Sequence, residues 1–164
     1  MELARELRNS ARTRKRISKK ITLNKKSNNQ IREKLLNEFK FPLVNGRDLK
    51  RFRLWEETKN ECLYCGQNIS GSDMLKGIAE IEHILPKSRS FDNSMNNFIL
   101  AHRHCNQAKD QATAYDFMKQ KGEVEFQNYI QRVNDLYQEG KGSISNRKFE
   151  NLMCSGQDLS LIHI

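Results

Sequence analysis

Residues 82–106 read EHILPKSRSFDNSMNNFILAHRHCN, and this stretch decides the fold. Two short segments, 78–85 and 97–101, contain β-branched and other apolar residues and are separated by a polar, loop-like stretch at 87–97. Segments of this length and composition predict two strands, the first ending at Pro86. From Asn106 to about Lys119 the apolar residues recur at helical spacing, so a helix is expected after the second strand.

The end of this stretch, His102-x-x-Cys105, has the same spacing as an earlier pair, Cys62-x-x-Cys65. Together the two pairs offer three thiolates and one imidazole, a tetrahedral ligand set typical of zinc. Four protein ligands leave no open coordination position, so we expect this Zn²⁺ to be structural and not catalytic. His104 is a competing ligand, but it is adjacent to Cys105 and cannot easily share its ion. A redox role would need a thioredoxin-like strand and helix around the first pair, which the sequence lacks.

A second polar group surrounds the end of the first strand. If zinc fixes Cys105, it also fixes the start of the helix that carries Asn106. That helix would pack against the strand bearing Glu82 and His83. A carboxylate and an amide oxygen suit a hard cation such as Mg²⁺. A histidine, whose ordinary pKa is about 6.5, suits a general base at neutral pH.

EHILP at 82–86, Asn97 and HRHCN at 102–106 together resemble the HNH, or ββα-metal, nuclease motif. The resemblance implies an α+β, mostly helical fold in which a ββα-metal core carries a three-cysteine, one-histidine zinc knuckle and flanking helices. It also implies roles for the motif residues: His83 is the general base, Glu82 and Asn106 are ligands of catalytic Mg²⁺ or Mn²⁺, and Asn97 holds the loop of the histidine. Many family members have Asp in place of Glu82, which leaves Glu80 as a second candidate ligand.

A wider resemblance extends over nearly residues 2–153. ELARE at 2–6, RFRLWEE at 51–57, ECLYCG at 61–66 and the stretch 82–106 are similar to the type II CRISPR RNA-guided endonucleases, the Cas-nine family, which act in antiviral defence. In that family the HNH domain is inserted in a RuvC-like nuclease and cuts the DNA strand that is paired to the guide RNA. The resemblance therefore implies three partners: the DNA target strand, the guide RNA–DNA heteroduplex and the remaining segments of the parent nuclease.

This resemblance also divides the chain. Residues 1–46 are expected to be a basic helical segment, similar to the end of a RuvC-like segment followed by a linker. The resemblance implies that such a flank moves as a hinge as well as binding nucleic acid. Residues 47–153 are expected to be the HNH domain with its flanking helices. Residues 154–164 do not resemble the family's continuation, and we expect a disordered or non-native tail.

Charge is distributed unevenly along the 164 residues, whose formal net charge is +9. Residues 1–60 contain 18 Lys and Arg against 7 Asp and Glu, whereas residues 61–164 contain 11 against 13. A basic arm on a nearly neutral remainder indicates a polyanionic partner. The candidate nucleic-acid contacts are Arg12, Arg14, Lys15, Arg16, Lys19, Lys20, Lys87, Arg89 and Lys109. No apolar run is long enough to cross a bilayer and no signal-peptide pattern follows Met1, so a cytoplasmic location is expected.

Further helices are predicted outside the motif. A helix-permissive basic stretch at 2–20 is followed by a predicted break at 24–30, NKKSNNQ, and by a helix over 31–39 that stops before Pro42. Shorter helices are expected over 49–55 and 149–153. The clearest amphipathic pattern spans 126–137.

Two other functions remain open at this point. One is a stand-alone HNH endonuclease of the homing or restriction type, although no DNA-reading element is evident beyond the basic arm. The other is a zinc-dependent nucleic-acid-binding module without catalysis. We expect the isolated chain to cut weakly, because guide pairing and domain docking present the substrate in the family.

The first prediction concerns zinc. Elemental analysis is expected to find about one Zn²⁺ per chain, and Cys62→Ser is expected to unfold the module because zinc binding is coupled to folding. Cys154→Ser is the matched control, since this cysteine lies outside both pairs. A zinc-free chain that is stably folded would contradict the prediction.

Overall fold

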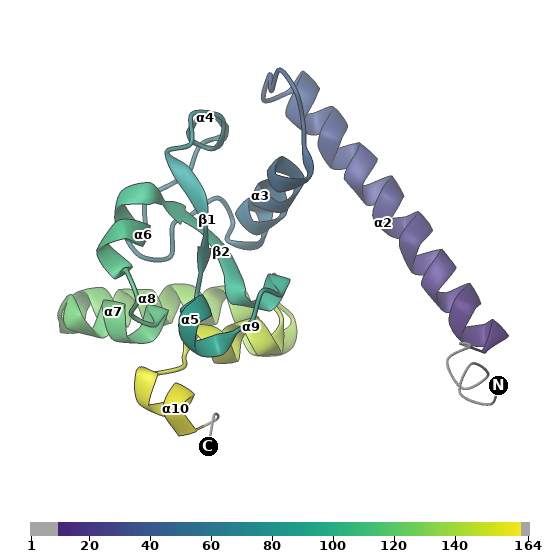
Figure 1. Ribbon diagram of the computed structural model, residues 1–164. Helices are drawn as coiled ribbons and strands as arrows, with labels where there is room; N and C mark the ends of the chain where they lie inside the picture. The colour runs from purple at the N-terminus through teal and green to yellow at the C-terminus, as the bar shows by residue number, and fades with distance from the viewer. Residues whose placement is uncertain (1–9, 162–164) are drawn as a thin grey trace. The chain divides into compact units, whose positions relative to one another are not determined.

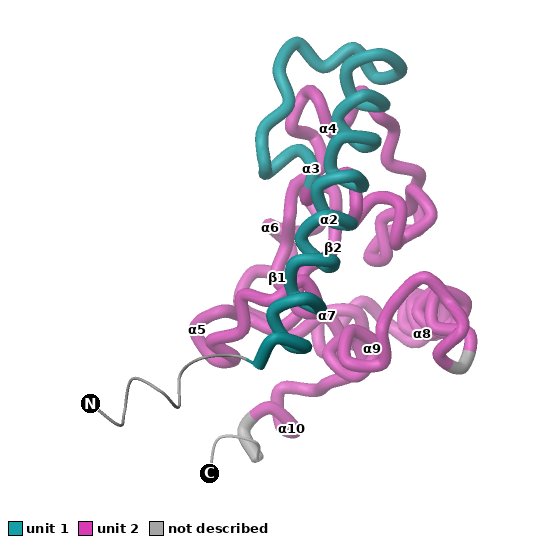
Figure 2. Tube along the Cα trace, turned by 90° about the vertical axis from the view of Figure 1, so that its right-hand side faces the viewer, with its two compact units in different colours: residues 1–49 teal, residues 50–164 magenta. Residues whose placement is uncertain are grey.

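The computed structural model describes residues 10–161, and the chain divides into two compact units, residues 1–49 and 50–164 (Figure 2). The ELARE segment at 2–6 lies outside the described residues, as do residues 162–164. The described part of the chain has no helix that is long and apolar enough to span a membrane.

The first unit is dominated by helix α2, Ala11–Asn37. Ser10 caps its start, and its side chain accepts a hydrogen bond from the backbone N–H of Thr13. The predicted break at 24–30 is wrong, because the helix runs through it without interruption. Asn and Ser lower helix propensity by less than about 0.7 kcal/mol each, and the segment contains neither Pro nor Gly. The helix does stop before Pro42, as the sequence predicts.

Helix α3, Gly46–Glu57, follows and confirms the helix expected over 49–55. Asn45 directly precedes the first residue of this helix. The Asn45 side-chain oxygen accepts hydrogen bonds from the backbone N–H groups of Arg47 and Asp48, which is the role of a helix N-cap.

The second unit contains the two expected strands. Strand β1, Ala79–His83, and strand β2, Phe98–His102, form an antiparallel pair in which Ala79 lies opposite His102 and His83 opposite Phe98. Helix α6, Arg103–Lys109, begins directly after β2 and contacts both strands (Figure 1). This arrangement confirms the mostly helical α+β class with a ββα core.

Two details near the core differ from the prediction. The helix expected over 106–119 is two helices, α6 and α7, Ala114–Gln120. Asp110 has a positive φ of 48°, which ends α6, and the Thr113 side chain caps α7 by accepting from the Asp116 N–H. The stretch 87–97 is not wholly loop, since it contains the short helices α5, Lys87–Ser90, and η1, Met95–Asn97.

The remaining helices complete the second unit, and α4 contacts β1. They are α4, Gly71–Leu75; α8, Glu123–Tyr137; η2, Gln138–Gly140; α9, Asn146–Leu152; and α10, Gly156–Leu161. In α8 the buried residues Tyr129, Val133 and Leu136 form one stripe, as the amphipathic pattern predicts, and α7 and α9 pack against this helix.

Helix α10 lies in the segment for which disorder was expected. Gly156 donates its N–H to the Asp116 carboxylate and accepts a hydrogen bond from Arg89, while Leu159 is buried. Part of the tail is therefore helical and attached to the second unit.

A prediction follows from the contact between α8 and α9. The hydroxyl of the fully buried Tyr129 donates to the Leu152 carbonyl at 2.8 Å. Tyr129→Phe leaves that buried carbonyl short of a partner and should lower the free energy of unfolding by about 1 kcal/mol. Urea denaturation measures the change. The control is Tyr137→Phe, whose hydroxyl bonds Asn146 at an exposed site; an equal loss in both variants would contradict the argument.

Candidate metal centre and active-site pocket

The structure brings the four predicted zinc ligands together. One ligand atom each from Cys62, Cys65, His102 and Cys105 lies within 4.8 Å of the others. Nδ1 of His102 is 3.3 Å from Sγ of Cys65. Zn–S and Zn–N bonds of about 2.3 and 2.1 Å need ligand atoms that crowd together in this way, so the site fits a tetrahedral metal ion. His104 is exposed and is not among these four ligands.

The first pair of ligands sits on a tight turn. Gly66 donates its N–H to the Cys62 carbonyl at 2.8 Å and has a φ of 70°, a conformation that favours glycine. Arg132 of α8 donates two hydrogen bonds to the Leu63 carbonyl. The turn is therefore fixed by a helix of the core as well as by its own backbone.

The second pair lies where β2 meets α6. His102 is the last residue of β2, and Cys105 lies in the first turn of α6. A hydrogen bond from the Cys105 thiol lowers the pKa of Cys62 to about 4, although burial opposes this shift. A thiolate at Cys62 is the form that binds metal.

The predicted general base and the predicted ligands of the catalytic cation line one pocket of about 260 Å³, whereas Asn97 is not among its lining residues. Glu82, His83 and Asn106 line it together with Lys109 and Lys87. Glu80 is not among its lining residues. Of the two acidic candidates, only Glu82 therefore shares the pocket with His83 and Asn106.

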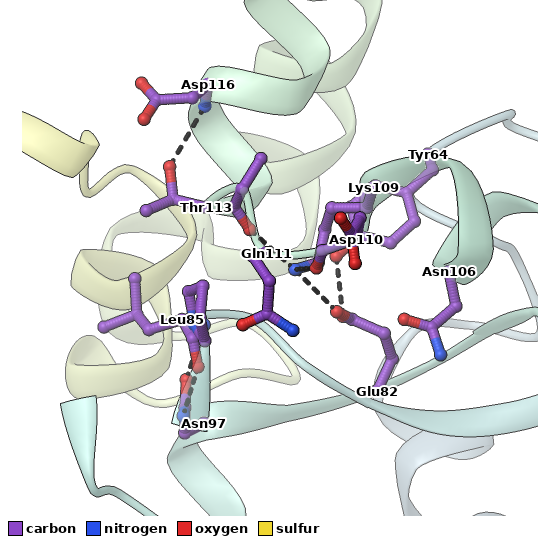
Figure 3. A network of polar contacts seen from close by, with 12 residues as sticks. Tyr64, Glu82, Leu85, Asn97, Asn106, Lys109, Asp110, Gln111, Thr113 and Asp116 are labelled. Carbon is purple, nitrogen blue, oxygen red and sulfur yellow. Dashed lines mark hydrogen bonds and ion pairs between the residues drawn. The ribbon is translucent and has the colours of Figure 1, made fainter. Parts of the chain in front are cut away.

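Glu82 is buried and is held by two side chains (Figure 3). Nζ of Lys109 lies 2.8 Å from Oε1, and the hydroxyl of Tyr64 donates to Oε2 at 2.7 Å. Burial raises the pKa of Glu82 to about 7, while Lys109 and Tyr64 act in the opposite direction. A carboxylate in this position is costly unless a cation accompanies it.

Asn106 is oriented by the other acidic residue. Its Nδ2 donates to Oε1 of Glu80 at 2.7 Å, and Oε2 of Glu80 is 3.5 Å from Nε of Arg103. With Nδ2 committed to Glu80, the amide oxygen of Asn106 is the atom left for a cation. Glu80 thus differs in surroundings from Glu82, and it contacts Asn106 directly.

His83 lies at the end of β1 and is half-buried. Its ring centroid is 4.5 Å from that of Phe98 on the paired strand. Its Nε2 donates to Oδ1 of Asn93 at 3.1 Å, and in the neutral ring this leaves Nδ1 as the proton acceptor. Asn93 was not predicted, because it lies in a polar loop where no spacing pattern distinguishes it from its neighbours.

Asn97 is fully buried and binds the loop that follows His83. Its Oδ1 accepts from the Leu85 N–H at 2.8 Å, and its Nδ2 donates to the carbonyls of Leu85 and Asp92 at 3.0 and 2.9 Å. These hydrogen bonds are the kind that a loop-positioning residue must make.

The predicted nucleic-acid contacts differ in their exposure and in their partners. Those that are exposed and whose charges are available are Arg12, Arg14, Lys15, Arg16, Lys19 and Lys20 on α2, and Lys87 at the pocket. Arg89 is exposed but donates to the Gly156 carbonyl at 2.7 Å. The prediction for Lys109 needs correction: its side chain is 1% exposed, because its charge balances Glu82 inside the protein.

The HNH endonuclease family profile matches residues 62–115. Among curated relatives, CRISPR-associated endonuclease Cas9 1 of Streptococcus thermophilus is 32% identical over 112 residues, which cover 67% of this chain and 10% of the relative. CRISPR-associated endonuclease Cas9 of Campylobacter jejuni is 38% identical over 74 residues, 44% of this chain and 8% of the relative. The chain therefore spans about a tenth of the length of these relatives.

The chain is also similar to solved structures of Cas9 proteins. The crystal structure of Streptococcus thermophilus Cas9 in complex with the AGAA PAM matches 90% of this chain and 15% of its own, with a TM-score of 0.67 and 26% identity. The Type II-C Cas9 enzyme from Actinomyces naeslundii matches 89% of this chain and 15% of its own, with a TM-score of 0.69 and 18% identity, which supports the fold alone.

A prediction tests the buried ion pair. Lys109→Met removes the cation and should raise the pKa of Glu82 further above about 7. The free energy of unfolding should then fall by about 3–5 kcal/mol at pH 9, where the carboxylate is charged and uncompensated, and by less at pH 7, where Glu82 takes up a proton. Urea denaturation at the two pH values measures both losses. Arg103→Met is the matched control, because it removes from the same helix an ion pair whose arginine side chain is 56% exposed, and it should cost less than about 1 kcal/mol. Similar losses in the two variants would show that burial does not increase the contribution of the Lys109–Glu82 pair to stability.

Proposed function

The chain contains an HNH endonuclease domain homologous to the HNH domains of Cas9 proteins, and on that premise we propose that it hydrolyses DNA phosphodiester bonds by a one-metal mechanism. The observation that carries this proposal is the convergence of Glu82, His83 and Asn106 on one pocket. Zn²⁺ at the cysteine–histidine cluster has a structural role here, because four protein ligands leave no position for substrate.

His83 is the general base in this proposal. Oδ1 of Asn93 accepts a hydrogen bond from the Nε2–H group, so Nδ1 is the ring nitrogen that can take a proton from water. Asn97 supports the arrangement through the loop, since it binds the carbonyl of Asp92, the neighbour of Asn93. Two asparagines thus hold the base, one through its ring and one through its loop.

Glu82 and Asn106 are the residues that would hold Mg²⁺ or Mn²⁺. Their carboxylate and amide oxygens are the donors that such cations prefer, and both residues line the pocket of His83. Bound there, the cation would stabilise charge on the scissile phosphate and on the leaving 3′ oxygen. Glu80 has a different role in this proposal, because it holds the NH₂ group of Asn106 so that the oxygen faces a cation.

The proposed substrate is the DNA strand paired to a guide RNA, by analogy with the relatives. The guide RNA–DNA heteroduplex and the other segments of a parent nuclease are the proposed partners. The basic side chains of α2 and Lys87 are exposed and suit contacts with a nucleic-acid backbone. Helix α2 is proposed as a moving linker as well as a binding surface, in line with the resemblance of this flank to the family.

The test is metal-dependent nicking of supercoiled plasmid by the 164-residue chain at high concentration. Mg²⁺ or Mn²⁺ should support slow nicking, EDTA should stop it, and His83→Ala should lower the rate by at least about 100-fold because the general base is lost.

His104→Ala is the control, since this histidine is exposed and lies outside the pocket lining and the ligand cluster. It should keep both zinc and the parent rate. Nicking that persists in EDTA and in His83→Ala would overturn the proposal. A folded, zinc-loaded chain that binds heteroduplex but shows no metal-dependent nicking would favour a non-catalytic binding module.

A further inference from the structure

Tyr64 lies between two zinc ligands, Cys62 and Cys65, yet its side chain does not belong to the zinc cluster. It is 2% exposed, and its hydroxyl donates to Oε2 of Glu82 at 2.7 Å (Figure 3). A tyrosine so deeply buried needs a partner for its hydroxyl, and here that partner is the carboxylate proposed to hold the catalytic cation.

The position of Tyr64 is fixed from two directions. Its backbone belongs to the turn that carries Cys62 and Cys65. Arg132 donates two hydrogen bonds to this turn at the carbonyl of the adjacent Leu63. Its ring meets that of Phe117 of α7 edge to face, with centroids 5.4 Å apart. The hydroxyl therefore has little freedom to follow Glu82, and Glu82 must adapt to the hydroxyl.

The second residue that contacts Glu82 also lies on an element that carries one of the predicted zinc ligands. Lys109, which reaches Oε1, belongs to α6, the helix whose first turn carries Cys105. Lys109 is held in turn by the Ala112 carbonyl at 2.7 Å. Both oxygens of Glu82 are thus bound by side chains from segments that a zinc ion would anchor.

We propose that Tyr64 is a positioning residue that links the structural zinc site to the carboxylate that binds the catalytic divalent cation. Zinc then does more than hold the fold: through Tyr64 it sets where the Glu82 carboxylate lies in the pocket. Residues that orient a metal ligand typically change metal affinity by about 10–100-fold when they are lost. This inference rests on the proposed function, because it takes Glu82 as a ligand.

The experiment uses the 164-residue chain, with Mn²⁺ as the probe followed by electron paramagnetic resonance and zinc measured by elemental analysis. Tyr64→Phe removes only the hydroxyl, and it should weaken Mn²⁺ binding by about 10–100-fold while zinc stays at the parent content. Tyr129→Phe is the matched control, since it also removes one buried hydroxyl, but from a bond to the Leu152 carbonyl. It should leave Mn²⁺ affinity within about twofold of the parent.

A double-mutant cycle with Glu82→Gln separates the two causes of any loss. If Tyr64 acts through Glu82, then Tyr64→Phe has no further effect on Mn²⁺ affinity in the Glu82→Gln background. An equal loss in both backgrounds, or parent-like affinity in Tyr64→Phe, overturns the inference. If Glu82→Gln itself binds Mn²⁺ like the parent, the proposed metal site fails instead, so the two failures are distinguishable.

A second measurement needs no loss of the hydroxyl and applies even if Tyr64→Phe does not fold. With 3-fluorotyrosine at position 64, added Mg²⁺ should change the ¹⁹F chemical shift. The Mg²⁺ concentration that gives half of this change should equal the concentration that gives half of the maximal nicking rate. The same label at position 137, where the hydroxyl bonds Asn146, should not respond. A ¹⁹F chemical shift at position 64 that does not change with Mg²⁺, while the nicking rate rises to its maximum, would also overturn the inference.

Discussion

The meeting of two short ligand pairs is the constraint on which the second unit depends. Their inner members, Cys65 and His102, are 37 residues apart in the chain. The first pair lies on a turn, whereas His102 and Cys105 lie where β2 passes into α6. A two-stranded sheet of this size is marginal by itself. A metal ion bound by all four residues would tie the end of this sheet and the following helix to a distant turn. It would fix the β2–α6 junction and with it Asn106, the residue that follows Cys105.

Side chains near this junction also explain how the protein tolerates the buried carboxylate of Glu82. Glu82 is buried beside the pocket, and Lys109 and Tyr64 partly offset the desolvation of its carboxylate. The residues around the pocket thus have distinct roles. Some face the pocket directly, and others, such as Glu80 and Asn97, hold a neighbour in place through hydrogen bonds.

The similarity to known proteins is unevenly distributed along the chain. The family profile spans the ββα core and the zinc pairs, whereas α2 and the C-terminal helices lie outside it. Structural neighbours cover most of the chain, yet the chain covers only 15% of the Streptococcus thermophilus structure. The residues that we propose to catalyse DNA cleavage therefore lie inside the profile. Helix α2, which we propose to contact the backbone of a nucleic acid, lies outside it.

The sequence by itself determined the four residues of the candidate metal cluster, the two strands, the amphipathic helix α8 and the candidate HNH positions, because each depends on spacing along the chain or on a local pattern. It failed where local preference is weak: it predicted a break inside α2, a single helix over 106–119 and disorder in the segment that contains α10. Only the tertiary structure decided which carboxylate faces the pocket, that Lys109 is an internal counter-charge, and that Tyr64 and Asn93 contact Glu82 and His83. Those contacts join residues that are far apart in the chain or lie on a loop, and their burial depends on packing that no local pattern encodes.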